Sequence, residues 1–364
     1  MTDEQLRFRI ALSLLDGIGD MTARTLVSYC GGVEQIFKTP KSKLLKIPGI
    51  GPKLAEKVSS FSQWKEVERE TEFIRKKNIH TWFYLDKNYP SRLRELPDSP
   101  ALLFGTGKMN PENKKVVAIV GTRKATDYGV SFTKNLVEGL QSQNILIVSG
   151  LAYGIDVAAH KAAINCGLET IAVVAHGLNQ IYPKVHTNIA RQMAEHGGII
   201  SDYHSQSKMR PENFPARNRI IAGLCDAIVV VESSQKGGAL ITAAVADSYN
   251  RDVFAVPGPV GSPQSVGCNL LIKRMKASLI ESAEDLLNAM NWGAVSKNEQ
   301  PKLLIDLTAD EQKVADLLKR DTPTHIDTLV TSLQWTSTRI AATLLEMEFK
   351  GALRSLPGSM YKLV

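Results

Sequence analysis

The segment Val116-Val117-Ala118-Ile119-Val120-Gly121-Thr122-Arg123 is the most informative about the fold of this chain. Its first five residues are all apolar, which is typical of a strand covered on both faces in a parallel sheet. A glycine, a hydroxyl and a cation follow directly, before a segment with helical spacing. Because backbone N–H groups at the start of a helix favour anions, Gly121, Thr122 and Arg123 form a candidate phosphate-binding loop.

Five further short apolar runs follow, with helical patterns between them. They are residues 145–148, 170–174, 198–201, 227–231 and 253–256. Strands that alternate with helices predict a doubly wound parallel sheet. We therefore expect an α/β domain with an extended Rossmann-like sheet at its core over residues 85–290.

The residues that follow the later strands also have ligand-binding chemistry. In an open α/β sheet, ligands bind outside the carboxyl ends of the strands, so these residues are expected to converge at one edge. The candidates are Lys184, Arg217, Asn218, Arg219, Gly237 and Gly238. Aromatic residues lie among the cations, as stacking of nucleic-acid bases requires. These are Tyr128, Tyr153, Tyr182 and Phe214.

The N-terminal segment contains an internal repeat. Leu15-Asp16-Gly17-Ile18-Gly19 recurs as Ile47-Pro48-Gly49-Ile50-Gly51, each time between helical patterns. The repeat predicts two helix-hairpin-helix units in an all-α, SAM-like domain, residues 1–84. Lys53 and Lys57 make the second copy the better candidate for phosphate contact, and a purely packing role for both copies is an equal alternative.

The C-terminal segment has a different pattern. Residues 291–302 are polar with Gly and Pro, which indicates a linker. Helical patterns near 309–319, 325–333 and 336–350 precede a Pro-Gly hairpin. This order predicts a winged helix over residues 303–364.

Composition narrows the function classes. The chain has 364 residues and a net charge of +7, which favours a polyanionic partner. No apolar run is long enough to span a membrane, and the N-terminus lacks signal-peptide features, so a cytoplasmic protein without membrane contact is expected. The spacing of Cys30, Cys166, Cys225 and Cys268 argues against a zinc site or a disulfide framework. The standard dinucleotide, ATPase and hydrolase motifs are missing, so we expect no cofactor, no metal and no catalytic residue.

Several motifs in one order resemble the DprA/Smf DNA-processing family. They are Ser149-Gly150 through His160, Gly177 through Tyr182-Pro183, Phe214-Pro215-Ala216-Arg217-Asn218-Arg219-Ile220-Ile221 and Val253-Phe254-Ala255-Val256-Pro257-Gly258. The resemblance covers residues 100–280, and the two flanking segments agree with longer family members. It implies a protein that binds single-stranded DNA without cleaving it, forms a homodimer through the Rossmann-like domain and loads the RecA recombinase during natural transformation.

The resemblance also assigns residues. It places DNA contacts at Gly121, Thr122, Arg123, Lys184, Arg217, Asn218 and Arg219, and a dimer contact at Leu270, Leu271 and Ile272. Two positions depart from the family pattern: His186 stands where an Asn is usual, and Met275-Lys276 stands where the last helix usually ends in Gly-Ala.

Other interpretations stay open at this point. The same edge of the sheet could serve a nucleotide N-glycosidase, for which Glu232 is the nearest carboxylate, or a ligand-sensing domain of a winged-helix transcriptional regulator. Arg217 and Arg219 could instead pair with Glu212 or Asp226. His160 is better explained as a packed histidine than as a base, and Asp156 as a residue that orients the turn at Gly154. The sequence leaves open the RecA-binding surface, the ligand of the winged helix and the binding of double-stranded DNA.

Overall fold

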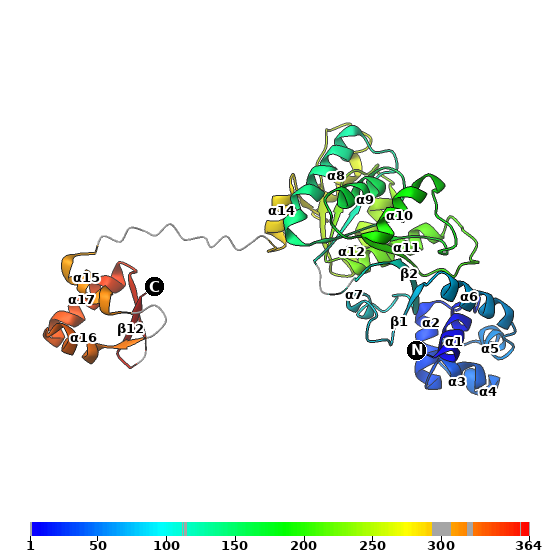
Figure 1. Cartoon of the computed structure of the whole chain (residues 1–364), viewed down its shortest axis with the longest axis horizontal. Helices are drawn as coiled ribbons and strands as arrows, with labels where there is room; N and C mark the ends of the chain where they lie inside the picture. Colours follow the sequence, from blue (N-terminus) through cyan, green and yellow to red (C-terminus); the bar gives the residue numbers. More distant parts are fainter. Residues whose placement is uncertain are drawn as a thin grey trace. The chain divides into compact units, whose positions relative to one another are not determined.

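The computed structural model describes residues 2–110, 112, 115–292, 307–318, 323–356 and 358–363. The chain divides into two compact units, residues 1–293 and 294–364, and each is described by itself. The first unit joins a helical N-terminal part to an α/β sheet (Figure 1), and the second is a winged helix. The expected fold class is therefore confirmed. Beyond Trp292, the expected linker lies outside the described residues.

A nine-stranded sheet forms the centre of the first unit. Its strand order is β1-β2-β6-β5-β4-β3-β7-β8-β9. All pairs from β6 to β9 are parallel, whereas β1 pairs with β2 and β2 with β6 in antiparallel fashion. The strands are β1 (His80–Phe83), β2 (Leu102–Gly107), β3 (Val116–Val120), β4 (Leu146–Ser149), β5 (Thr170–Val173), β6 (Gly197–Ser201), β7 (Ala227–Val230), β8 (Asp252–Ala255) and β9 (Ser278–Leu279).

Helices cover both faces of this sheet, as the apolar strands require. Val116, Ala118 and Val120 point into a core shared with α11 and α12, whereas Val117 and Ile119 point into a core shared with α8 and α9. The six expected strands are thus confirmed as β3 to β8. The helices are α7 (Ser91–Arg94), α8 (Asp127–Gly139), α9 (Ile155–Asn165), α10 (Thr187–Glu195), α11 (Asn213–Leu224), α12 (Gly238–Ser248), α13 (Val266–Lys273) and α14 (Ala283–Ala289), with 3₁₀ turns η1 (Gln141–Gln143) and η2 (Lys184–His186).

The N-terminal helices gather beyond the β1–β2 end of the sheet (Figure 1). They are α1 (Asp3–Ser13), α2 (Asp20–Cys30), α3 (Val33–Lys38), α4 (Lys41–Leu44), α5 (Pro52–Ser59) and α6 (Trp64–Lys76). Gly17 and Gly49 have φ values of 84° and 79°, which let the chain turn sharply before α2 and α5. The repeat therefore forms two helical hairpins, as expected.

The helical part and the sheet share one core. Phe83, Leu102 and Phe104 of the strands β1 and β2 pack with the buried residues of α1 and α2. The boundary expected between residues 84 and 85 falls directly after the edge strand β1, and it stays a prediction.

The second unit has helices α15 (Ala309–Leu317), α16 (Ile326–Leu333) and α17 (Ser337–Phe349), and strands β10 (Thr324–His325), β11 (Leu353–Leu356) and β12 (Met360–Leu363). The strands form a three-stranded sheet in the order β10-β12-β11. A capping box at Thr308 begins α15, and Thr336 is the N-cap of α17, which explains why the sequence pattern located both helices well.

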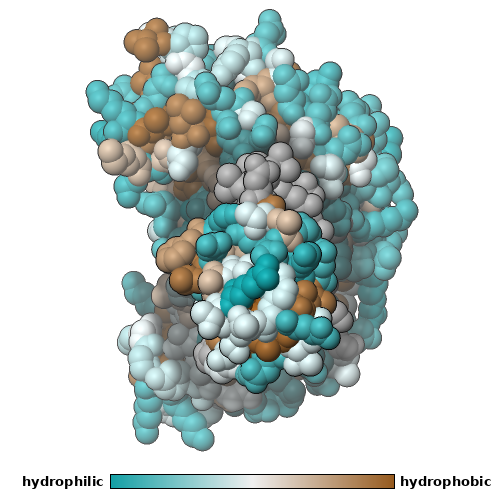
Figure 2. Space-filling view, turned by 90° about the vertical axis from the view of Figure 1, so that its left-hand side faces the viewer, coloured by the Kyte–Doolittle hydropathy of each residue, from teal (hydrophilic) through white to brown (hydrophobic). Residues whose placement is uncertain are grey.

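On the face shown in Figure 2, hydrophilic residues predominate and apolar ones lie in small separate groups. In the part of the chain that the structure describes, no helix has both the length and the apolar character needed to cross a bilayer.

Candidate nucleic-acid interface

A pocket of about 530 Å³ opens at the carboxyl edge of the sheet, between the loops that follow β3 and β7. The chain adds β4, β5 and β6 on one side of β3 and then β7 and β8 on the other side. The space between the ends of β3 and β7 is therefore the topological switch point of the sheet, where α/β domains bind ligands. We call it the switch-point pocket. Its lining includes Gly121, Thr122, Arg123, Asp156, Phe214, Arg217, Asn218, Ser233, Ser234, Gly237, Gly238 and Thr242.

Backbone hydrogen bonds hold the loop after β3 in place. The N–H of Thr122 donates to the carbonyl of Glu232 at 2.7 Å, and the N–H of Ile155 donates to the carbonyl of Thr122 at 3.2 Å. Gly121 packs so closely on Ile155 that a side chain would not fit there. The side chain of Arg123 stays exposed, with its guanidinium 5.3 Å from the centre of the Phe214 ring. The loop is rigid, and its cation is presented to solvent.

Aromatic rings adjoin Arg123. The rings of Tyr182 and Phe214 lie 6.0 Å apart, and a smaller cavity of about 70 Å³ runs between them, Arg123 and Tyr153. Tyr153 and Tyr182 are 49% and 45% exposed, which is unusual for tyrosines that merely pack. Lys184 begins η2 beside Tyr182-Pro183, and it is exposed. The cations and rings therefore share one surface, as contact with a nucleic-acid strand requires.

Arg217 is a buried residue in the lining of the switch-point pocket. It is 4% exposed, and its guanidinium donates to the carbonyl of Gly150 at 2.8 Å and to that of Val173. Burial lowers the pKa of Arg217, and it raises the pKa of Asp156 opposite. Arg217 thus ties the ends of β4 and β5 together and offers little surface to a ligand.

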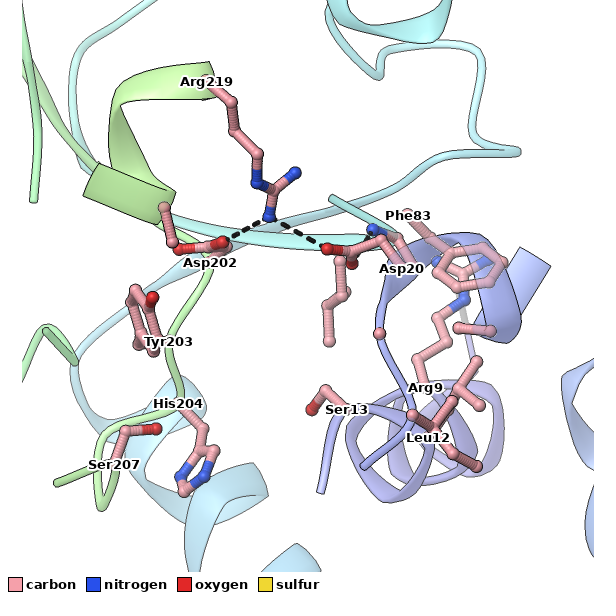
Figure 3. A pocket seen from close by; sticks show the side chains of 16 residues that line it. Arg9, Leu12, Ser13, Asp20, Phe83, Asp202, Tyr203, His204, Ser207 and Arg219 are labelled. Atoms are coloured by element: carbon pink, nitrogen blue, oxygen red, sulfur yellow. Dashed lines mark hydrogen bonds and ion pairs between the residues drawn. The ribbon is translucent and has the colours of Figure 1, made fainter. Parts of the chain in front are cut away.

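The structure does not bring Arg219 into the switch-point pocket. Its guanidinium nitrogen Nη2 donates to Asp20 at 2.9 Å and to Asp202 at 2.8 Å, and Nη1 donates to the carbonyl of Asp98. These partners differ from Glu212 and Asp226, which the sequence had suggested. Asp226 instead pairs with Arg92 at 2.7 Å. Arg219 joins the first helical hairpin to the sheet (Figure 3).

The glycines after β7 are placed as the sequence predicts. Gly237 is the N-cap of α12, and Gly238 begins that helix with open space around its Cα. Both line the switch-point pocket. The N–H of Gly237 already donates to the carbonyl of Ser234 at 3.0 Å, so an anion would meet the N–H groups of the first turn of α12, beginning with Gly238.

The buried histidines are structural. Burial lowers the pKa of His160 to about 3, so its imidazole is neutral, and Nδ1 lies 2.6 Å from the Thr170 hydroxyl. His186, which replaces the usual Asn, lies 2.8 Å through Nδ1 from the carbonyl of Leu151, and its ring contacts Tyr153. His186 thus supports the loop after β4.

Two further cations, which the sequence pattern did not single out, lie close to the pocket-lining residues in the chain. Lys208 and Arg210 are exposed on the segment between β6 and α11, directly before the residues that line the pocket. Their signal was available in the sequence, because two cations closely precede Phe214.

The residues expected at a dimer contact lie on α13. Leu270, Leu271 and Ile272 are all half-buried. Leu271 and Ile272 pack against the core shared with α11 and α12. Met275, after the helix, is 94% exposed.

Comparison with known proteins adds independent information. Residues 80–291 match the family described as DNA recombination-mediator protein A, residues 298–359 the DprA winged helix domain and residues 8–61 the SAM-like helix-hairpin-helix tandem. The chain is 31% identical to Protein Smf of Synechocystis over the full length of both. It is 40% identical to DNA processing protein DprA of Streptococcus pneumoniae over 56% of this chain and 71% of the relative.

Two solved structures are similar. The X-ray structure of DprA from Streptococcus pneumoniae has a TM-score of 0.69 at 32% identity and covers 78% of this chain and 97% of its own. A DprA structure from Helicobacter pylori, which is described by its single-stranded DNA binding mode, has a TM-score of 0.53 at 28% identity. It covers 58% of this chain and 95% of its own.

Proposed function

Because the chain belongs to the DprA/Smf family of DNA recombination mediators, we propose that it binds and protects single-stranded DNA in the cytoplasm and loads RecA onto it during natural transformation. The observation that carries the proposal is the exposed Arg123 beside the rings of Phe214 and Tyr182 at the switch point of the sheet. The similar DprA structure from Helicobacter pylori, which is described by its single-stranded DNA binding mode, supports the choice of single-stranded DNA.

The proposed contacts divide by chemistry. Arg123 and Lys184, with the N–H groups of Gly121 and Gly238, would hold phosphates, and the exposed rings would stack with bases. Gly237 would let the strand approach closely, since its own N–H already donates to the carbonyl of Ser234 at 3.0 Å. Thr122 and Asn218 are proposed as neutral hydrogen-bonding contacts. Phosphate contacts and stacking depend little on sequence, which suits a protein that handles any incoming strand.

A hydrolytic function would need a carboxylate free to act on substrate. Glu232 instead accepts hydrogen bonds from the N–H of Thr126 at 2.9 Å and from its hydroxyl at 2.5 Å. Asp156 is buried opposite Arg217. We therefore propose binding without catalysis. Turnover of a mononucleotide by the purified protein would contradict this and favour an N-glycosidase.

Replacing Arg123 by Ala tests the DNA interface. Loss of one phosphate contact should weaken single-strand binding about fivefold for all sequences and reduce the slope of log affinity against log salt by about 0.7. Fluorescence anisotropy at several salt concentrations measures both. Arg191→Ala, an exposed arginine of α10 that lines no pocket described above, is the matched control and should change neither quantity. An unchanged slope for Arg123→Ala would remove this residue from the interface.

We further propose a homodimer through α13 and the outer edge of β9. Strand β9 ends the sheet, and exposed Met275 and half-buried Leu270 lie near it in the chain. Two linked pockets would raise the affinity for a long strand through effective concentration.

The dimer proposal predicts that Leu270→Glu yields a folded monomer, because Leu270, unlike Leu271 and Ile272, is not packed on the core. Light scattering should show the halved mass, and RecA loading on long strands should fall. Leu85→Glu, at an exposed position after the opposite edge strand β1, should stay dimeric. A wild-type protein that is monomeric at micromolar concentration would refute the homodimer.

A further inference from the structure

The helix α17 of the winged-helix unit exposes apolar side chains. Its inner side packs in the core of the unit through Ile340, Leu344 and Met347. Steps of four, three and four residues place a second set of side chains on the opposite side of the helix. This set, which we call the α17 stripe, consists of Thr338, Ala342, Leu345 and Phe349, all of them exposed. Leu345 and Phe349 are 53% and 83% exposed, so two large apolar side chains adjoin each other in solvent.

DNA is a poor partner for the α17 stripe. In a winged helix, the second helix of the helix-turn-helix enters the major groove, and here that helix is α17. None of the four stripe residues is charged. Arg339 and Lys350, the cations of α17 and its C-cap, are paired with Asp310 and Glu311. Exposed Glu346 borders the stripe and would repel phosphates, so the stripe suits a protein surface better than a duplex.

The α17 stripe is complementary in size to a second copy of itself. Its small residues, Thr338 and Ala342, come first along the helix, and its large residues, Leu345 and Phe349, come last. Antiparallel packing of two copies would place Phe349 of one against Thr338 of the other, and Leu345 against Ala342. Each large side chain would then fill the space above a small one, as close helix packing requires. Parallel packing would set Phe349 against Phe349 and leave a gap at Ala342.

The charges that border the stripe are complementary in the same arrangement. Arg339 and Glu346 are exposed and lie on the same border of the stripe, seven residues apart. In an antiparallel pair, Arg339 of one copy would face Glu346 of the other, and the dyad would repeat this ion pair. A guanidinium has five N–H donors, so Arg339 can keep its contact with Asp310 at the same time. Lys and Arg balance Asp and Glu over residues 301–364, so two copies carry no net charge that would repel them.

We propose that the winged-helix unit is a self-association module, in which the α17 stripes of two copies of this chain pack antiparallel. This contact is separate from the one proposed at α13, and it goes beyond the proposed DNA binding. Two large apolar side chains from each copy make an interface well below the roughly 1,200 Å² of a standard complex, so the pairing is weak between free units. A homodimer through α13 would strengthen it, because it raises the effective concentration of the two winged helices.

Cross-linking of the full chain without DNA tests the arrangement. The variants Ala342→Cys and Thr338→Cys are made in a protein whose half-buried Cys30 and Cys166 are replaced by Ser, and the two buried cysteines are kept. A bismaleimide with a two-carbon spacer then joins cysteines of two copies that lie close together. In the antiparallel pair the two copies of position 342 are offset by about 5 Å along the helix axis, and those of position 338 by about 17 Å. Ala342→Cys should therefore give at least about fivefold more covalent dimer than Thr338→Cys.

Leu345→Glu, added to Ala342→Cys, should reduce the covalent dimer to the level of Thr338→Cys, because it places two carboxylates in the apolar contact. Leu317→Glu is the matched control, since Leu317 is an exposed leucine of α15 outside the stripe. It should leave the yield of covalent dimer unchanged.

Reversal of the bordering charges keeps the proposal testable if a single variant is unstable. Arg339→Glu added to Ala342→Cys should lower the yield of covalent dimer, and the further change Glu346→Arg should restore it. The contact of Arg339 with Asp310 is not restored by this second change, so recovery would come from pairing between copies.

Equal yields at positions 338 and 342, or no covalent dimer at either, would overturn the inference and leave the proposed DNA binding untouched. A yield that stays low in the charge-reversed double variant would also overturn it. Weaker binding of duplex DNA by Leu345→Glu than by Leu317→Glu would assign the stripe to DNA instead. Loss of single-strand binding by Arg123→Ala concerns the switch-point pocket alone, so the two proposals fail independently.

Discussion

Replacement of Arg219 by Ala is expected to lower the free energy of unfolding of the first unit by about 3–5 kcal/mol, because it leaves two carboxylates without their cation. Asp202 is 10% exposed, and burial already raises its pKa to about 6 despite the adjacent Arg219. Without that guanidinium the pKa of Asp202 should rise further. The contact between the first hairpin and the sheet would also lose its central hydrogen bonds.

Urea unfolding followed by circular dichroism measures this effect. Arg210→Ala is the matched control, since Arg210 is an exposed arginine on the adjoining segment, and its replacement should change stability by less than about 0.5 kcal/mol. A different outcome would contradict this prediction: Arg219→Ala would be as stable as the wild-type protein, and the slope of log DNA affinity against log salt would decrease. Arg219 would then be a phosphate contact, as the sequence suggested.

Replacement of Gly154 by Ala should destabilise the protein by about 3 kcal/mol or more and abolish single-strand binding. Gly154 is the N-cap of α9 with φ 77° and ψ −123°, a conformation that only glycine adopts readily. A Cβ atom there would overlap the carbonyl oxygen of Thr122 and lie 2.9 Å from the carbonyl carbon of Arg123. The loop that presents Arg123 would therefore have to move.

Gly167→Ala separates backbone strain from this clash. Gly167 also has a positive φ, 70°, but open space surrounds the position of its Cβ. Its replacement should cost about 1 kcal/mol and leave DNA affinity unchanged. Comparable losses of stability and affinity in the two variants would show that the contact with the Thr122–Arg123 loop is unimportant.

The two helical hairpins show which features a local sequence pattern can predict. The repeat predicted two similar turns, and both form. Their surroundings differ, because Asp20 of the first copy accepts a hydrogen bond from the N–H of Ala101 and pairs with Arg219. The corresponding turn of the second copy, at Gly49 and Gly51, faces open space. The docking of one copy depends on residues about 80 and 200 positions away, which no local repeat encodes.

Local sequence patterns were sufficient to predict the parallel sheet, the helical hairpins and the winged helix. Uninterrupted apolar runs, paired glycines and N-cap residues act over a few positions, so their structural consequences are local. It also placed Arg123, Gly237 and Gly238 at the correct edge, because the carboxyl ends of parallel strands must lie together. The edge strands β1 and β9 and the strand β2 next to β1 were missed, since their definition comes mainly from the strands they pair with.

The contacts of each arginine in the Arg217-Asn218-Arg219 motif depend on tertiary packing. Successive residues of a helix point about 100° apart, so Arg217 and Arg219, which are two positions apart, point in different directions. Arg217 lies beneath the switch-point pocket, and Arg219 points toward the first hairpin. Arg217 then meets the carbonyls of Gly150 and Val173, and Arg219 meets Asp20 and Asp202. Asp20, Asp202 and Arg219 likewise meet only because parts that are distant in sequence pack together. No spacing along the chain specifies that meeting.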